Sequence, residues 1–425
     1  MRLCAFFGLV LLMFSFAGCE RDTTQPSPTA SNEVFPEPKA SEERSTFEKL
    51  AAKKKDFEAK RKSLIDTQLA QANDFIAKNP EAKPPAGGAS DGGPPPPPPS
   101  EAARAARREL GQMYRSFTKP RVDLNLEYLT FLNAEYFPGL LKYSEYCHKT
   151  FLAEPNKANG GALVQLVAEL YDNGNVDEAF LYSTDLAKNG FDSGELDDLI
   201  AASAYCTDHF SEAAEFFNKA MEKSKYVRAS LVANKEDIAT SQKAWDGEKA
   251  IRDKEASSND LPRVKLETEV GDIVFELYEN EAPETVGNFI SLVESGYYDN
   301  TTFHSHVLTA HVFTGSKNGD AKGNPGYTIY GESEKPDRRF PFRGSLTMSA
   351  PGNNAGAIYS ISFRPSPYNF GYYTTFGRVV EGFDVLPKIA KFVAREPMVG
   401  MEQTKIKKAT VLRKRDHEYK PHKVE

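Results

Sequence analysis

Residues 262–289 read PRVKLETEVGDIVFELYENEAPETVGNF, and this stretch decides the fold of the C-terminal part of the chain. Apolar residues recur over 264–268 and again over 273–277 in a pattern typical of strands. Val270, Gly271 and Asp272 between the two runs form the expected turn. Proline at position 283 begins an expected helix that ends at Glu294, with Gly296 just beyond. Two strands, a turn and a helix indicate an antiparallel β domain.

The same pattern continues toward the C-terminus. More short strands follow, separated by loops rich in glycine and proline, and the last expected strand covers residues 404–412. Because helices are few in this region, the pattern favours an all-β barrel.

A series of motifs stands along this region. It comprises Gly271-Asp272-Ile273, Ala282-Pro283-Glu284-Thr285-Val286 with Asn288-Phe289, Gly296-Tyr297-Tyr298, Phe303-His304, Gly326-Tyr327-Thr328-Ile329, Gly344-Ser345-Leu346-Thr347-Met348 and Thr375-Phe376-Gly377-Arg378-Val379-Val380-Glu381-Gly382. In this order the motifs resemble the cyclophilin family over residues 262–413. The resemblance implies a closed eight-stranded antiparallel barrel with two capping helices, at 283–294 and 383–390. It also implies peptidyl-prolyl cis-trans isomerase (rotamase) activity, and with it a role in protein folding.

Such an isomerase needs no covalent step and no metal, because it only has to twist an amide bond whose rotation is slow. The family holds the proline ring in an apolar pocket. An arginine donates hydrogen bonds toward the prolyl nitrogen, and glutamine and asparagine side chains grip the flanking backbone. The arginine normally follows the Phe-His pair, and here Ser305 and His306 stand there. An insertion of one residue at Ser305 puts His306 in the arginine position, and without it Ser305 occupies that position.

Other positions of the implied groove also depart from the family. With the insertion, His311 replaces a pocket aromatic residue and Thr314 replaces a glutamine. The remaining substituted positions are Ala350, Ile358, Ser360, Tyr368 and Tyr373. The scaffold motifs stay while the groove changes, so we expect catalysis to be weak or lost, with His306 as the candidate catalytic residue. We expect no cofactor. Three histidines, at 304, 306 and 311, raise the alternative of a metal site, but no acidic residue is interleaved and we expect none.

Residues 101–255 have a helical pattern with a period of 34 residues. Ala168 corresponds to Ala202, Tyr171 to Tyr205 and Ala179 to Ala213. This region resembles tetratricopeptide repeats, and a plain helical bundle is the alternative. Cys147 and Cys206 fall in these helices among apolar residues, so two buried free thiols are expected rather than a disulfide.

The first residues resemble a bacterial lipoprotein signal. Arg2 precedes an apolar run from Leu3 to Phe16, too short for a comfortable membrane span, which leads into Ala17-Gly18-Cys19. Cys19 is the expected lipidation site, and an ordinary signal peptide is the alternative. The expected location is the periplasmic side of the envelope, and Glu20 favours the outer membrane.

The chain has 425 residues and a net charge of −7, which argues against nucleic-acid binding through bulk positive charge. The expected segments are a signal peptide (1–18), a disordered tether (19–46), a charged helix (47–79), a Pro/Gly-rich linker with a hexaproline spacer (80–100), the helical region (101–255), the barrel (256–415) and a polar tail (416–425).

Two functions follow from this organisation. The first is an anchored cyclophilin-type protein that engages proline-containing or unfolded polypeptides. The second is a non-catalytic scaffold of the cell envelope, in which the helical repeats and the barrel are docking surfaces for envelope proteins.

Overall fold

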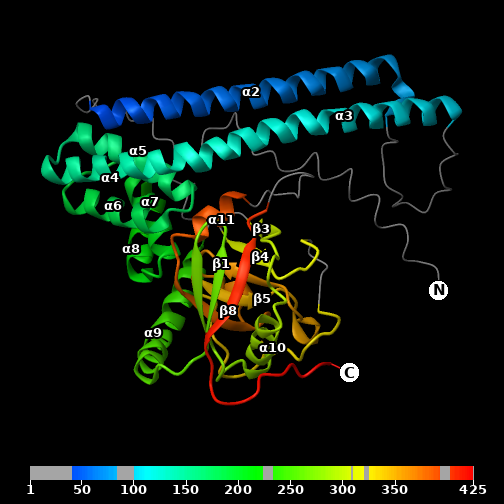
Figure 1. The fold of residues 1–425 in the computed structure, drawn as a ribbon. Helices are drawn as coiled ribbons and strands as arrows, with labels where there is room; N and C mark the ends of the chain where they lie inside the picture. The colour runs from blue at the N-terminus through cyan, green and yellow to red at the C-terminus, as the bar shows by residue number, and fades with distance from the viewer. Residues whose placement is uncertain are drawn as a thin grey trace.

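A computed structural model describes residues 41–83, 100–223, 233–307, 310–319, 325–392 and 403–424 (Figure 1). The predictions made for the signal peptide, for Cys19 and for the hexaproline lie outside these residues.

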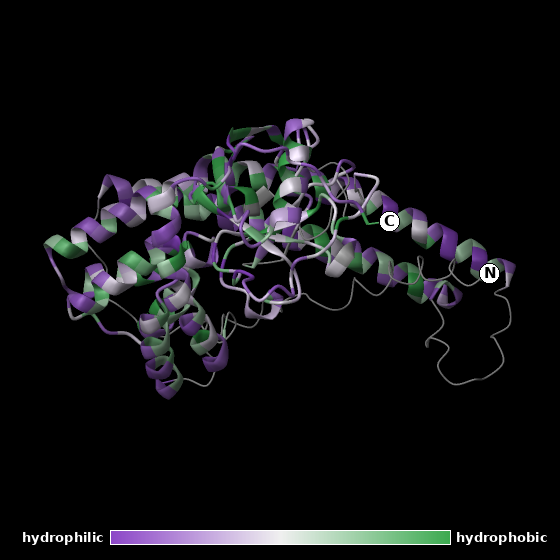
Figure 2. Ribbon diagram, turned by 90° about the horizontal axis from the view of Figure 1, so that it is seen from below, coloured by the Kyte–Doolittle hydropathy of each residue, from purple (hydrophilic) through white to green (hydrophobic). Residues whose placement is uncertain are grey.

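A long helical hairpin forms the N-terminal part. It consists of α2 (Glu42–Lys78), the short 3-10 turn η1 (Pro80–Ala82) and α3 (Glu101–Phe131), which lie side by side (Figure 1). Ser41 and Ser100 cap the two helices, because their hydroxyls accept hydrogen bonds from the first free backbone N–H groups. Hydrophilic residues cover much of the hairpin (Figure 2). Helix α2 begins at Glu42 rather than at residue 47, so its start lies inside the expected tether.

Helical hairpins make up the next part of the chain. The π-helical turn η2 (Leu132–Tyr136) leads into α4 (Phe137–Ala153), and two hairpins follow: α5 (Lys157–Asp172) with α6 (Val176–Lys188), and α7 (Leu196–Cys206) with α8 (Phe210–Lys223). The period of 34 residues therefore corresponds to two successive hairpins. Ala179 and Ala213 are fully buried at equivalent positions, where two helices approach closely. Assignment to the tetratricopeptide family stays a prediction. The two buried free thiols, Cys147 and Cys206, are confirmed.

The C-terminal part is a curled sheet of eight strands. The strands are β1 (Arg263–Thr268), β2 (Asp272–Leu277), β3 (Ser305–Val307), β4 (His311–Thr314), β5 (Ser345–Met348), β6 (Tyr359–Ser362), β7 (Thr375–Glu381) and β8 (Ile406–Arg413), in the order β3-β4-β6-β5-β7-β2-β1-β8. Its concave side holds a core of apolar side chains, among them Leu266, Phe275, Val312, Leu346 and Ile361. Helices α10 (Pro283–Glu294) and α11 (Leu386–Phe392) accompany the sheet, and the short turns η4 (Gly352–Asn354) and η5 (Pro367–Asn369) flank β6.

The two edge strands, β3 and β8, approach each other without forming a ladder in the described residues. Thr302 and Lys405, which precede them, form a single antiparallel bridge. The Phe303 backbone N–H donates to the Thr404 carbonyl at 3.0 Å. The sheet is thus a curled, nearly closed structure, and the fully closed barrel stays a prediction. Helix α10 has the expected bounds, whereas α11 begins at Leu386 rather than at 383.

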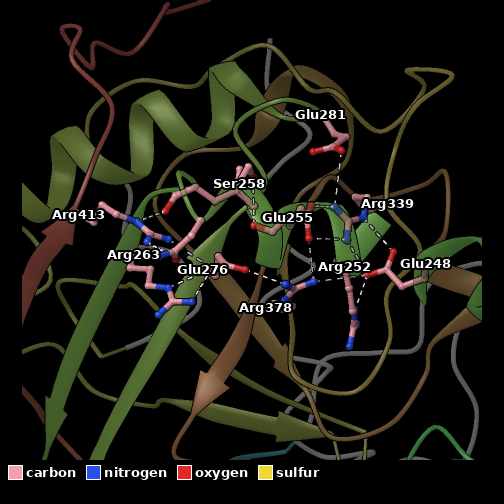
Figure 3. A network of polar contacts seen from close by, with 12 residues as sticks. Glu248, Arg252, Glu255, Ser258, Arg263, Glu276, Glu281, Arg339, Arg378 and Arg413 are labelled. Carbon is pink, nitrogen blue, oxygen red and sulfur yellow. Dashed lines mark hydrogen bonds and ion pairs between the residues drawn. The ribbon is translucent and has the colours of Figure 1, made fainter. Parts of the chain in front are cut away.

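Helix α9 (Lys235–Ser258) joins the helical part to the sheet through buried charges (Figure 3). The Arg339 side chain, which is 1% exposed, lies between the carboxylates of Glu248 and Glu255 and over the ring of Tyr278 at 3.9 Å. Arg378 of β7 bridges Glu255 at 3.0 Å and Glu276 of β2 at 2.7 Å. Helix α9 runs past the expected boundary at residue 256, and the carboxylate partners of the barrel arginines lie on the N-terminal side of that boundary.

A substitution in this network tests its contribution. We expect Glu255→Ala in the full chain to lower the free energy of unfolding by about 3–5 kcal/mol, because two buried guanidinium groups lose a carboxylate. The matched control is Glu48→Ala, which removes an exposed pair with Arg44 four residues away and should cost about 0.5 kcal/mol or less. Urea denaturation measures both. Equal, small losses would show that the network contributes little.

Candidate functional site

Strand pairing brings one set of side chains to the convex face of β3, β4, β6 and β5. Ser305 pairs with Phe313, Phe313 with Ser360, and Ser360 with Thr347. Their chain neighbours Val312, Ile361 and Leu346 lie in the core, and side chains alternate along a strand. This surface also includes the paired residues His311 and Ser362. We call the face made by Ser305, His311, Phe313, Thr347, Ser360 and Ser362 the groove face.

His311 is the most highly connected side chain of the groove face. Its Nε2 atom lies 3.0 Å from the Ser366 hydroxyl and 3.3 Å from the Asn369 amide, and its Nδ1 lies 3.2 Å from the Ser362 hydroxyl. These partners fit a ring that accepts at Nε2 and donates from Nδ1. Ser366 and Asn369 belong to the loop of residues 366–370, which contains η5 and covers the ring.

The surroundings of His311 keep its imidazole neutral. Burial, together with the positive charge of Arg364, lowers the pKa of His311 to about 4. Near pH 7 the ring therefore carries no charge. It offers one donor and one acceptor, and both already have protein partners.

Two of the predicted groove residues occupy the wrong strand phase. Thr314 is fully buried, pairs with the core residue Tyr359 and donates to the Thr302 carbonyl at 3.0 Å. His306 pairs with Val312, so its register position is out of phase with His311. Ser305, the alternative that needs no insertion, is in phase with His311, because it pairs with Phe313, two residues further along β4. Gly315 fixes the end of β4: its φ is +96°, and a Cβ atom there would lie 2.2 Å from the Ala357 carbonyl oxygen.

The other predicted residues lie around the ends of β5 and β6. Ala350 and Ile358 are half-buried where the Ser349 N–H donates to the Ile358 carbonyl at 3.1 Å. Ser360 is buried, and its hydroxyl is 3.4 Å from the Thr347 carbonyl oxygen. Tyr373 is half-buried. Tyr368 is 65% exposed, so its side chain lies largely in solvent rather than in a closed pocket.

Sequence reasoning missed Phe313, Ser362, Ser366 and Asn369. Without the insertion, the implied glutamine position moves from Thr314 to Phe313, which the strand pairing sets opposite Ser305 on the groove face. Ser366 and Asn369 reach His311 only because their loop folds over β4, and no local pattern encodes that contact. Within the described ranges, no group of three or more His, Cys, Asp or Glu side chains is arranged to hold a metal ion. None of the helices described in the structure is long and apolar enough to cross a bilayer.

The depressed pKa of His311 makes stability depend on pH. An unfolded histidine has a pKa of about 6.5, so the unfolded chain takes up this proton first and the folded protein loses stability as pH falls from about 6.5 toward 4. We expect the melting temperature to drop less between pH 7.5 and pH 5 in His311→Gln than in the unchanged protein. His209→Gln, at an exposed turn, is the control. Identical pH profiles for His311→Gln and the unchanged protein would contradict the assignment.

Known proteins resemble the C-terminal part of the chain. The family model of cyclophilin type peptidyl-prolyl cis-trans isomerase/CLD matches residues 263–411. Peptidyl-prolyl cis-trans isomerase-like 1 of Neurospora crassa is 34% identical over 160 residues, which are 36% of this chain and 97% of that protein. Peptidyl-prolyl cis-trans isomerase cypE of Dictyostelium discoideum is 38% identical over 131 residues, covering 30% of this chain and 83% of the relative.

Among solved structures, a cyclophilin type peptidyl-prolyl cis-trans isomerase of Cryptosporidium parvum is 27% identical, with 36% of this chain and 97% of that chain covered and a TM-score of 0.33. The sequence relatives are matched over nearly their whole length by the segment that contains the curled sheet and the groove face. Through this segment, the chain belongs to the cyclophilin-type peptidyl-prolyl cis-trans isomerase family.

Proposed function

We propose that the protein engages proline-containing or unfolded polypeptides through the groove face, and that its isomerase activity is weak or lost. Family membership supports the class of ligand. The surroundings of His311, which are polar and already satisfy its two ring nitrogens, support weak or lost isomerase activity. The family resemblance implies an apolar pocket for the proline ring at this place, and here a neutral imidazole is hydrogen-bonded to Ser362, Ser366 and Asn369.

The electrostatic requirement of the reaction supports the same conclusion. The prolyl nitrogen gains lone-pair character as the amide twists, so a fixed donor aimed at it lowers the barrier. Ser305 occupies the in-phase position implied for the arginine, and a serine hydroxyl lacks the charge and the forked donors of a guanidinium group. Losing one such donor raises a barrier by about 3–4 kcal/mol.

Refolding of a protein whose folding is limited by proline isomerisation tests this function. We expect the full chain to accelerate refolding far less than an ordinary cyclophilin does. Ser305→Arg alone should recover little, because a lone arginine lacks the neighbouring groups that position substrate. Ser305→Arg, Phe313→Gln, Ala350→Asn and Ser360→Phe together should recover more than their single effects add up to, since all act on one transition state.

A phase-shifted variant is the control for this experiment. The control carries His306→Arg and Thr314→Gln together with Ala350→Asn and Ser360→Phe. Its arginine and glutamine positions are out of phase with the groove face, so it should recover less isomerase activity than the in-phase variant. Ordinary family-level activity in the unchanged protein would overturn the proposal.

A scaffold is the second candidate function, and exposed apolar side chains on the helical hairpins favour it. Leu152, Leu181 and Met221 are large hydrophobic residues exposed on α4, α6 and α8. In this reading the hairpins are tetratricopeptide-like and bind an envelope protein. The test compares the unchanged protein with Leu181→Lys. If the variant no longer captures an envelope protein while its barrel still binds unfolded polypeptide equally well, the scaffold is favoured.

Export and lipid anchoring complete the proposal, and they rest on the sequence Ala17-Gly18-Cys19. A diacylated Cys19 would hold the protein at the periplasmic side of a membrane, because two or more acyl chains give stable anchoring. We expect Cys19→Ser to move the protein from the membrane fraction to the soluble periplasmic fraction. Fractionation with a carbonate wash measures this, and unchanged membrane association would contradict lipidation.

A further inference from the structure

A short segment of the barrel packs against helices α8 and α9. We call residues 338–343, Arg-Arg-Phe-Pro-Phe-Arg, the strap. Phe342 is fully buried and packs edge-on against Trp245 of α9 at 4.8 Å and near Phe210 of α8 at 6.0 Å. The guanidinium of Arg252 lies over the Trp245 ring at 4.6 Å and closes this aromatic site. Phe342 therefore packs between side chains of α8 and α9.

The next residue of the strap adds a charged contact. Arg343 donates two hydrogen bonds of 2.6 Å to the two carboxylate oxygens of Asp177. Asp177 lies in the first turn of α6, where the helix dipole also favours a carboxylate. A paired two-point contact of this kind recognises a guanidinium group specifically. Phe210, Trp245, Arg252 and Asp177 together form what we call the seat.

The other side of the strap holds the loop that covers the groove face. The Ser366 backbone N–H donates to the Pro341 carbonyl at 2.9 Å. Phe340 packs against Phe370 at 5.2 Å, and Arg338 lies over the Phe370 ring at 4.7 Å. Ser366 is also a hydrogen-bond partner of His311. One segment thus contacts the seat on one side and the cover of the candidate groove on the other.

We propose that the seat is a docking site for a short peptide segment with an aromatic residue followed by arginine, occupied here by the strap of the same chain. A segment of that chemistry from another protein competes with Phe342 and Arg343. When it takes the seat, residues 340–343 of the strap move while Arg339 stays paired with Glu248 and Glu255, the 366–370 loop loses its support and the groove face is uncovered. The docking site itself stands on the contacts above, and only its effect on client binding rests on the proposed function.

The peptide Asp-Arg-Arg-Phe-Pro-Phe-Arg-Gly-Ser, the sequence of residues 337–345, is the probe. Fluorescence anisotropy compares its binding to the full chain and to the full-length double variant Phe342→Ala/Arg343→Ala, in which both side chains that occupy the seat are removed. We expect the variant to bind the peptide about tenfold more tightly. A peptide with alanine in place of its second phenylalanine and last arginine should not bind. Equal, weak binding by the unchanged chain and the variant, with native circular dichroism in both, would overturn the proposal.

A surface variant avoids any loss of folding. Asp177→Ala removes the carboxylate from a half-exposed position, and Asp123→Ala, which removes the exposed partner of Lys119, is the matched control. We expect hydrogen exchange of residues 363–373 to become about tenfold faster in Asp177→Ala and to stay unchanged in Asp123→Ala. Unchanged exchange in both variants would show that the seat does not hold the loop.

Client binding separates this inference from the proposed function. A permanently unfolded, proline-containing polypeptide should bind more tightly to Asp177→Ala than to the unchanged chain. Faster loop exchange without any client binding in either protein would uphold the seat and contradict the proposed function. Client binding that is equal in both proteins, with unchanged exchange, would uphold the proposed function and contradict the seat.

Discussion

The buried guanidinium of Arg339 is the interaction on which the arrangement of the two parts depends. A buried charge is costly unless it is paired and hydrogen-bonded, and here Glu248 and Glu255 of one helix supply both carboxylates. Glu281 of the barrel adds a third carboxylate at 3.6 Å. Because the two acids that accept hydrogen bonds from Arg339 belong to α9, its charge is fully compensated when the two parts are docked. Arg378 extends the pairing into the sheet through Glu276, so α9 is tied to strands β7 and β2.

The apolar core and the groove face lie on opposite sides of the same strands. The inward-facing residues of β4, β5 and β6 form an apolar core, whereas the groove face between them carries hydroxyls, one neutral imidazole and Phe313. Strand alternation makes the two sets independent, since a substitution on one face leaves the packing on the other unchanged. The chemistry of the groove therefore depends on His311 and its partners rather than on the fold.

Local patterns predicted the strands and α10, because alternation and helix-start signals act over a few neighbouring residues. They left the site between two registers, because an assumed insertion at Ser305 selects His306 and Thr314, whereas the strand pairing without it puts Ser305 opposite Phe313 on the groove face. Helix α9 has a charged sequence that is typical of a solvated surface. Its buried role comes from Arg339, which is 91 positions away from Glu248, and no pattern in the sequence pairs residues at that separation.

The order of synthesis determines when α9 gains its contacts with the barrel. Ribosomes deliver Glu248, Glu255 and Trp245 before they deliver Arg339 and Phe342, and domains generally begin to fold as they emerge. Until the barrel is synthesised, Glu255 lacks its two arginine partners, Glu248 pairs only with Arg252 of the same helix, and the Trp245 ring lacks its contact with Phe342. For that interval α9 has its contacts with the preceding helices, such as Trp245 against Phe210 of α8, but not those with the barrel. Docking of α9 onto the barrel is consequently a late step of folding, and a ribosome-bound chain that stops before residue 339 exposes the surface of α9 that the barrel later covers.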